Sequence, residues 1–196
     1  VAVSKPEVNI GNDTTVCNNI ATTINAGTGF NVYEWNTGET DPLITVNPQS
    51  PAYFAVTVSD SIGCLATDSV FFDVIYEPVI VADPGDTSLC EGEALVFECS
   101  AQGTGPVAYQ WYKDGLLIAG EDDSLLFFNF LVPEDSGVYH CVAENVCGTD
   151  VTGSSILSVF SLPVVVNQPV TGLVCEGDTV KLFADVEGTL PLLYQW

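Results

Sequence analysis

An internal repeat at a fixed offset limits most strongly what this chain can fold into. Residues 175–196 align without a gap with residues 90–111, and nine aligned positions are identical. The same offset of 85 places the apolar run that begins at Pro163 on the run that begins at Pro78. A sequence that repeats at a fixed period folds as a series of similar modules rather than around one large core.

Residues 1–77 follow the same plan more loosely. Prolines, aromatic residues and cysteines recur there in the order in which the next module has them. The chain is therefore predicted to hold two complete modules, 1–77 and 78–162, and the N-terminal part of a third over 163–196. The recurring residues are Pro6, Cys17, Tyr33, Trp35, Tyr53 and Cys64 in the first module and Pro78, Cys90, Tyr109, Trp111, Tyr139 and Cys147 in the second.

Each module has the residue pattern of a β-sandwich. In the second module, Leu95, Phe97 and Cys99 occupy alternate positions, and so do Tyr109 and Trp111. Alternation with a period of two places such residues on one face of a strand. Short strands of this kind, with turn signals every roughly 8 to 12 residues and no helical periodicity, indicate an all-β fold of tandem sandwiches.

The charge of the chain excludes several classes of partner. It carries 26 acidic and 3 basic residues, a formal net charge of −23, and no arginine. Such a chain cannot neutralise phosphates, so we expect no nucleic-acid partner and no attachment to anionic lipid. A hydrophobic content of 47% is enough for a packed core. No apolar run approaches the roughly 20 residues of a membrane span, and no signal peptide is recognisable.

Four residues of the second module resemble the pattern of immunoglobulin domains. Cys99 and Trp111 twelve residues later correspond to the first cysteine and the tryptophan of that fold, and Tyr139 and Cys141 correspond to its tyrosine corner and second cysteine. Asp135 and Gly137 before them belong to the same pattern. The resemblance implies tandem immunoglobulin-like β-sandwiches, with an I-set-like second module and a disulfide between Cys99 and Cys141. The expected core residues are Trp35, Trp111, Trp196, Tyr53 and Tyr139.

Two segments of the first module suggest a source for the chain. The sequence YEWNTGE from Tyr33 and the sequence YFAVTVSDSIGC from Tyr53 are similar to PKD-like and Ig-like repeats. Such repeats occur in large surface adhesins of gliding bacteria that are exported by the type IX secretion pathway. The resemblance implies an extracellular, cell-surface location for the chain.

The seven cysteines are predicted to form disulfides. They include no C-x-x-C pair, and a single histidine accompanies them, which argues against a zinc site. Aligning the modules places Cys90 on Cys17 and Cys147 on Cys64, which predicts two copies of one bond, Cys17–Cys64 and Cys90–Cys147. Cys175 corresponds to Cys90, and its partner is expected outside this chain. Disulfides of this number indicate an oxidising compartment, and buried free thiols are the alternative.

The sequence offers little catalytic chemistry. His140 is the one histidine, and alternation along its strand is expected to point it toward solvent. No catalytic motif is recognisable, so no catalytic residue, no enzyme activity and no cofactor are predicted. Calcium is a weak candidate because Asp83, Asp86, Asp122 and Asp123 supply hard oxygen ligands. Solvated acidic loops explain the same residues more simply, and no metal site is predicted.

A recurring tripeptide suggests glycosylation. Aspartate, then serine or threonine, then an apolar residue or threonine occurs five times, and the pattern is similar to the O-glycosylation signal of exported proteins in the same bacterial group. Turns that lead into apolar strands would enrich the same tripeptide, so both interpretations stay open. The candidate acceptors are Thr14, Ser61, Ser69, Ser124 and Thr179.

These observations favour a structural and adhesive role. Apolar strands pass from one module almost directly into the next, which predicts a stiff, acidic, disulfide-linked rod in a secreted adhesin or extracellular filament. The expected partners are neighbouring immunoglobulin-like modules of the same chain, other copies in a fibre, and surface glycans or proteins.

Two other interpretations come from different classes of protein. One is a spacer or carbohydrate-binding module of an exported enzyme, for which Tyr112, Phe127 and Phe54 are the candidate outward aromatic residues. The other is a eukaryotic receptor ectodomain, which the lack of arginine and the first module argue against.

Overall fold

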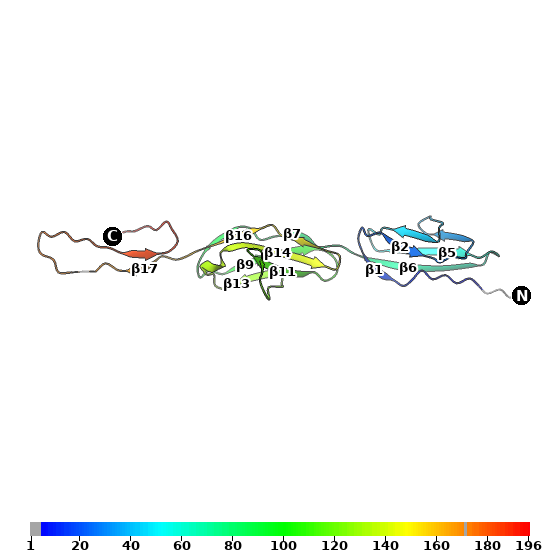
Figure 1. The fold of residues 1–196 in the computed structure, drawn as a ribbon, viewed down its shortest axis with the longest axis horizontal. Coiled ribbons are helices and arrows are strands. Elements are labelled where there is room, and N and C mark those ends of the chain that lie inside the picture. The colour runs from blue at the N-terminus through cyan, green and yellow to red at the C-terminus, as the bar shows by residue number, and fades with distance from the viewer. Residues whose placement is uncertain (1–4, 171) are drawn as a thin grey trace. The chain divides into compact units, whose positions relative to one another are not determined.

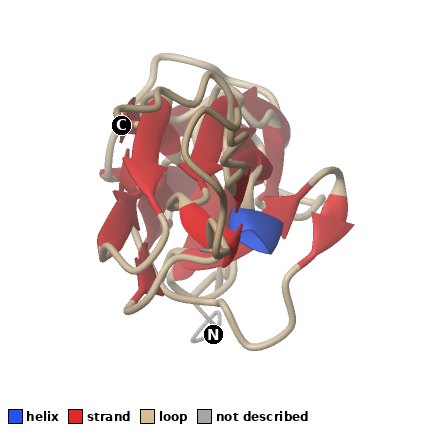
Figure 2. Ribbon diagram, turned by 90° about the vertical axis from the view of Figure 1, so that its left-hand side faces the viewer, coloured by secondary structure: helices blue, strands red, loops and turns tan. Residues whose placement is uncertain are grey.

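The computed structural model describes residues 5–170 and 172–196 and contains two units, each with its own core. Strands form almost all of the regular structure, and a single short helical turn, η1 (Pro133–Asp135), accompanies them (Figure 2). Unit 1 comprises Val1–Val79 with two later segments, Gln102–Val107 and Glu144–Thr149. Unit 2 comprises Ile80–Ala101, Ala108–Ala143 and Asp150–Trp196. The expected all-β, tandem immunoglobulin-like fold is confirmed.

Unit 1 is a sandwich of a four-stranded and a two-stranded sheet. The larger sheet has the order β1-β6-β5-β3, and the smaller sheet pairs β2 with β4. Figure 1 labels β1, β2, β5 and β6 of this unit. β1 runs parallel to β6, whereas β6, β5 and β3 are successively antiparallel. The strands are β1 (Thr14–Cys17), β2 (Thr22–Asn25), β3 (Val32–Trp35), β4 (Leu43–Val46), β5 (Ala52–Ser59) and β6 (Leu65–Ile75).

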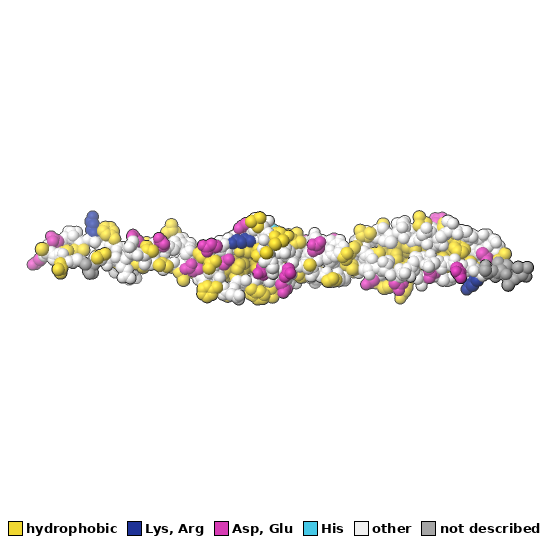
Figure 3. Space-filling view, turned by 60° about the horizontal axis from the view of Figure 1, so that its bottom comes forward, with side chains coloured by type: hydrophobic (Ala, Val, Ile, Leu, Met, Phe, Trp, Pro, Cys, Tyr) yellow, Lys and Arg dark blue, Asp and Glu magenta, His cyan; other side chains and the backbone are white. Residues whose placement is uncertain are grey.

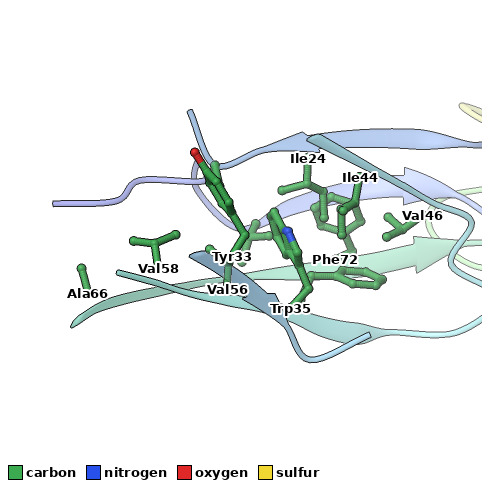
Figure 4. Close-up of a cluster of buried hydrophobic side chains, with 12 residues drawn as sticks. Ile24, Tyr33, Trp35, Ile44, Val46, Val56, Val58, Ala66 and Phe72 are labelled. Atoms are coloured by element: carbon green, nitrogen blue, oxygen red, sulfur yellow. The ribbon is translucent and has the colours of Figure 1, made fainter. Parts of the chain in front are cut away.

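Alternation along the strands builds the core of unit 1. Tyr33 and Trp35 of β3 are buried between exposed neighbours, and Phe54, Val56 and Val58 of β5 follow the same rule. Figure 4 shows the side chains of Tyr33, Trp35, Val56 and Val58 between the two sheets. The period of two in the sequence is therefore enough to decide which residues enter this core.

Unit 2 contains a sandwich with the same kind of parallel edge. Its main sheet has the order β12-β11-β14-β16-β8, with β15 paired to β14, and β8 runs parallel to β16. Two smaller pairs are β13-β9 and β10-β7. The strands are β7 (Val79–Ala82), β8 (Thr87–Cys90), β9 (Leu95–Glu98), β10 (Ser100–Gln102), β11 (Ala108–Lys113), β12 (Leu116–Leu117), β13 (Leu125–Phe128), β14 (Gly137–Asn145), β15 (Gly148–Val151) and β16 (Ser155–Phe160).

A tyrosine corner closes the core of unit 2. Tyr139 is 1% exposed, and its hydroxyl donates to the carbonyl oxygen of Asp135 in η1 over 2.7 Å. Burial and the nearby carboxylates of Asp135 and Asp114 raise the pKa of the Tyr139 hydroxyl above its ordinary value. Trp111, Cys99 and Tyr139 all lie inside this core, so the sequence places these three correctly.

Two of the expected core residues lie outside. Tyr53 is 64% exposed because it alternates with Phe54, which takes the inward position, and its ring packs on Phe71 of β6 with the centroids 4.7 Å apart. Trp196 is 74% exposed because the segment that follows β16 forms only one strand pair, β17 (Val164–Asn167) with β18 (Asp185–Glu187), among its described residues. Both predictions of burial are wrong, whereas Trp35, Trp111 and Tyr139 are buried as expected.

The acidic side chains are spread over the surface. On the face drawn in Figure 3, Asp and Glu lie among polar and apolar side chains, and few lysines accompany them.

None of the helical structure in residues 5–170 and 172–196 has the length and apolar character that a membrane-spanning helix needs.

Candidate functional site

A disulfide between Cys17 and Cys147 is the main chemical feature of unit 1. The two cysteines are 130 residues apart in sequence, and their Cα atoms are 5.5 Å apart, an ordinary span for a disulfide. Cys17 is the last residue of β1, and Cys147 lies in the turn between β14 and β15. The bond therefore ties the end of β1 to the segment Glu144–Thr149 within this unit.

This bond replaces the predicted pair Cys17–Cys64. Cys17 pairs with Ile75 at the last position of β6, while Cys64 directly precedes Leu65 at the first. β6 has 11 residues, which at a rise of roughly 3.3 Å each separate the two cysteines by about 35 Å. A disulfide requires Cα atoms within about 7 Å, so the prediction Cys17–Cys64 is wrong, and Cys64 is a free, half-buried thiol.

The predicted pair Cys90–Cys147 is wrong for the same reason. Cys90 pairs with Phe160 at the end of β16, next to the start of β14, whereas Cys147 lies past the end of β14. The nine residues of β14 span about 30 Å. Cys90 is free and exposed, and so is Cys175.

Asn145 holds the turn of the disulfide in place. It is a buried polar residue of unit 1 whose side-chain amide donates to the carbonyl oxygens of Tyr76, at 2.7 Å, and of Thr104, at 3.0 Å. The side-chain oxygen of Asn145 accepts the backbone N–H of Cys147 over 2.9 Å. A fully used buried amide of this kind fixes local geometry because each unmade bond would be costly.

Thr104 and Tyr76 complete this arrangement. The Tyr76 N–H donates to the Thr104 hydroxyl over 2.7 Å, and the Thr104 N–H donates to the Tyr76 carbonyl oxygen over 3.4 Å. We call the hydrogen-bonded set of Tyr76, Thr104 and Asn145 the clasp. It lies at the end of the sandwich where the disulfide forms.

Cys99 and Cys141 are buried in unit 2 as two free thiols. The Cys141 thiol donates to the Val142 carbonyl oxygen over 3.6 Å. The expected disulfide between them is not formed in this structure. Burial, followed by the contact with Cys141, raises the pKa of the Cys99 thiol, and burial likewise raises the pKa of Cys141.

The weak calcium candidates act as local hydrogen-bond acceptors. Asp83 accepts the Gly153 N–H over 3.0 Å, and Asp86 accepts the Ile156 N–H over 2.8 Å. Asp123 accepts the N–H of the next residue over 2.7 Å, and Asp122 is exposed. Among the residues that the structure describes, no cluster of three or more His, Cys, Asp or Glu could hold a metal ion.

The candidate glycosylation sites are accessible in four cases of five. Thr14, Ser61, Ser69 and Thr179 are exposed, and Ser124 is half-buried. The structure therefore leaves glycosylation as a prediction for these residues.

The outward aromatic residues do not form one platform. Phe54 is buried in the core of unit 1, contrary to the expectation that it faces outward. In unit 2, Phe127 is 57% exposed, while Tyr112 is half-buried and stacks on His140 with the ring centroids 4.8 Å apart. His140 is thus covered on one ring face instead of being fully turned to solvent.

Sequence reasoning missed the clasp, although the repeat carried a signal for it. The pair Gly103-Thr104 recurs as Gly188-Thr189 at the offset of 85. An identical pair inside a loop, where side chains are otherwise free to vary, indicates a backbone contact. The partner of Cys17 had no comparable signal, because cysteines in adjacent modules fit the same spacing rules.

Comparison with known proteins assigns the central part of the chain. Residues 77–145 match the family described as Immunoglobulin domain. The matched segment runs from β7 to β14 and includes the tryptophan and the tyrosine corner described above.

Three similar proteins are long proteins from vertebrates. Mouse Hemicentin-1 is 30% identical over 145 residues, which are 71% of this chain and 3% of that protein. Chicken Protein sidekick-2 is 31% identical over 144 residues, 68% of this chain and 6% of that protein. Human Brother of CDO is 31% identical over 115 residues, 54% of this chain and 10% of that protein. The chain thus spans a tenth or less of the length of these relatives.

Solved structures with several immunoglobulin domains have a similar fold. An I-band fragment of titin superposes with a TM-score of 0.79 at 20% identity, over 97% of this chain and 78% of the fragment. Immunoglobulin domains 1–4 of Sidekick-1 superpose with a TM-score of 0.61 at 22% identity, over 78% of this chain and 48% of that one. At these identities the likeness concerns the fold.

Proposed function

We propose that this chain is a non-enzymatic, load-bearing and adhesive repeat segment of a secreted cell-surface protein. Its immunoglobulin repeats resemble those of adhesion proteins, which supports the proposal. In this role the modules act in series, and exposed loops or glycans meet glycans or proteins of another surface. The net charge of −23 keeps neighbouring copies apart.

The Cys17–Cys147 disulfide is the observation that carries the load-bearing part of the proposal. Tension applied to the two ends of the chain passes along the backbone to Cys17, crosses the sulfur atoms, and leaves from Cys147. The residues between the two cysteines are bypassed while the bond is intact. Strands β2 to β14 are then protected from extension by a covalent bond rather than by their hydrogen bonds alone.

Single-molecule stretching of the chain tests this role. Without reductant, the residues enclosed by the disulfide should not contribute to the extended length. Reductant should release 130 residues, or about 450 Å at roughly 3.3 to 3.6 Å per residue. A variant with Cys17→Ser and Cys147→Ser should extend fully without reductant. Full extension of the unreduced natural chain would refute the load-bearing role.

Export by the type IX pathway of gliding bacteria is the finer form of this proposal. It rests on the similarity of the segments that begin at Tyr33 and Tyr53, whereas the relatives found come from vertebrates. The sequence of the same protein on either side of this chain would distinguish a filament from a spacer module. Many further copies of the repeat would favour a filament, and an adjoining catalytic domain would favour a spacer module.

A further inference from the structure

Cys90 occupies the same position in unit 2 as Cys17 does in unit 1. Each is the last residue of a strand that runs parallel to the final strand of a sandwich, and each has a register partner at the end of that strand: Ile75 for Cys17 and Phe160 for Cys90. In both cases the N–H of the next residue donates to the carbonyl oxygen of that partner over 2.9 Å. The two cysteines therefore match in backbone geometry, yet only Cys17 is bonded.

The two bonds between Tyr76 and Thr104 of the clasp recur beside Cys90. The Ser161 N–H donates to the Thr189 hydroxyl over 2.7 Å, and the Thr189 N–H donates to the Ser161 carbonyl oxygen over 3.3 Å. These are the bonds of Tyr76 and Thr104 repeated at the offset of 85, where their lengths are 2.7 Å and 3.4 Å. The loop that contains Thr189 is thus bound to Ser161 in the way that the loop that contains Thr104 is bound to Tyr76.

Packing of the repeated glycines agrees with this match. A Cβ on Gly103 would lie 3.2 Å from the Cα of Pro78, and a Cβ on Gly188 would lie 3.1 Å from the Cα of Pro163. A side chain at either position would force the neighbouring backbone to shift by a few tenths of an ångström. The backbones therefore approach each other in the same way at both places.

In unit 1, a third contact at this place is the turn with Cys147. By the offset of the repeat, the equivalent turn of the module that begins at Pro163 would fall past Trp196. The first module has its own equivalent turn between β5 and β6, where Cys64 is free. The Cys64 N–H donates to the side-chain oxygen of Asp60, four residues earlier, over 2.9 Å, and the Cys147 N–H donates to that of Asn145, two residues earlier, over 2.9 Å. Cys64 and Cys147 therefore both lie in a turn between strands and both have their backbone N–H bound by a side chain of that turn.

We propose that each strand-end cysteine of this repeat is joined to the turn cysteine of the next module. Cys90 then bonds to the turn cysteine of the module that begins at Pro163, and Cys64 bonds to the strand-end cysteine of a preceding module. Each bond forms by exchange with a disulfide-donating oxidoreductase. The two thiols give up two protons and two electrons, and the disulfide of the oxidoreductase is reduced to two thiols.

The consequence is a chain of overlapping covalent loops. The loop closed by Cys17 and Cys147 encloses Cys90, and the loop that begins at Cys90 encloses Cys147 and Cys175. Each loop therefore begins inside the one before it. This connectivity leaves no free thiol at Cys64, Cys90 or Cys175. The proposed bonding can be true or false whether or not the chain bears load.

Disulfide mapping of the natural full-length protein tests the proposal. The protein is alkylated before denaturation and cleaved without reduction by a protease specific for Asp and Glu, since lysines are few and arginine is absent. We expect the Cys90 peptide to be linked to the turn peptide of the next module, with complete loss of Cys90 alkylation. Alkylated Cys90, a Cys90–Cys147 link, or a link from Cys90 to a second copy of the protein would each overturn it.

A pair of single substitutions provides the matched control. In the full-length protein, Cys17→Ser should make Cys147 reactive toward a maleimide probe and raise the count of labelled thiols by one. Cys90→Ser should raise that count by one as well, with the new label on the turn of the following module. No new label, or a label on Cys147, would contradict the proposal. The mapping of the natural protein decides the question if either variant fails to fold.

Discussion

Each unit has a buried tryptophan whose indole N–H is hydrogen-bonded to a loop carbonyl oxygen, but the side chains that pack on the ring differ. The indole N–H of Trp35 in unit 1 donates to the carbonyl oxygen of Asp41 over 2.8 Å, and that of Trp111 in unit 2 donates to the carbonyl oxygen of Asp123 over 2.9 Å. Both rings are buried, at 5% and 0% exposure. A buried indole needs such an acceptor, so both units make the bond, each through a different loop.

The surroundings of the two rings diverge from there. In unit 2, Phe97 contacts Trp111 and Tyr139 with centroid distances of 6.3 Å and 5.5 Å, and the core also contains two thiols. The core of unit 1, over its described residues, contains no cysteine, and aliphatic residues, Tyr33 and the pair Phe54–Phe72 fill it around Trp35. The sandwich can therefore be built without sulfur, and the thiols of unit 2 give that core a sensitivity to pH that unit 1 lacks.

Removing each tryptophan is the strongest test of this comparison. Trp111→Ala and Trp35→Ala should each lower the free energy of unfolding by about 3 to 5 kcal/mol, because a large buried ring leaves a cavity. Each loss should be confined to the unit that carries the substitution. Urea denaturation followed by the fluorescence of the remaining tryptophans and by circular dichroism measures this. Equal loss in both units from one substitution would contradict the independence of the two cores.

Alkaline pH should destabilise unit 2 through its thiols. Burial keeps Cys99 and Cys141 neutral by raising their pKa values above the ordinary 9.0. In the unfolded chain these thiols ionise near pH 9, so the stability that they provide is complete below that pH and declines as the pH rises. The expected slope is about 1.4 kcal/mol per pH unit for each thiol.

Urea titrations at pH 8, 9 and 10, followed by Trp111 fluorescence in unit 2, measure this slope. The variant with Cys99→Ala and Cys141→Ala is the control and should lack the contribution of the thiols. If oxidation joins the natural pair, the slope of the natural chain should equal that of the control. Comparison of the reduced and oxidised proteins therefore reports directly on the bonding state of this pair.

The repeat and the alternation of residues were enough to predict the fold, but not the cysteine pairs. The sequence correctly identified Cys17 with Cys90 and Cys64 with Cys147 as equivalent residues. It could not tell that the two residues of one module lie at opposite ends of a strand, since spacing along the chain says nothing about which end of a sandwich a turn occupies. The pairing depends on that geometry, and the structure joins Cys17 to Cys147 instead.

A shift of one residue explains the error at Tyr53. Order of recurrence aligned Tyr53 with Tyr139, and both lie in a strand that pairs with the last strand of its sandwich, β5 with β6 and β14 with β16. In unit 1, however, Phe54 is inward, so its neighbour Tyr53 must face outward. Because the side-chain period of a strand is two, an alignment error of one position reverses the predicted face.

The buried tyrosine hydroxyls give the smallest and most specific comparison. The hydroxyl of Tyr139 donates to Asp135 over 2.7 Å, whereas that of Tyr33 donates to the carbonyl oxygen of Gly27 over 3.1 Å. Tyr139→Phe should cost about 1 kcal/mol of unfolding free energy because it leaves a carbonyl oxygen unpaired. Tyr33→Phe should cost less, since this residue is 8% rather than 1% exposed and water can reach its partner more easily.

Chemical denaturation of the two variants and of Tyr53→Phe, an exposed control, measures the difference. If Tyr33→Phe lowers the free energy of unfolding as much as Tyr139→Phe or more, the tyrosine corner does not stabilise unit 2 more than an ordinary buried hydroxyl does. The pKa of Tyr139 is raised in the folded state, so the natural residue also loses stability as the pH rises above about 10. Tyr139→Phe should remove that contribution, which separates the effect of this hydroxyl from that of the neighbouring thiols.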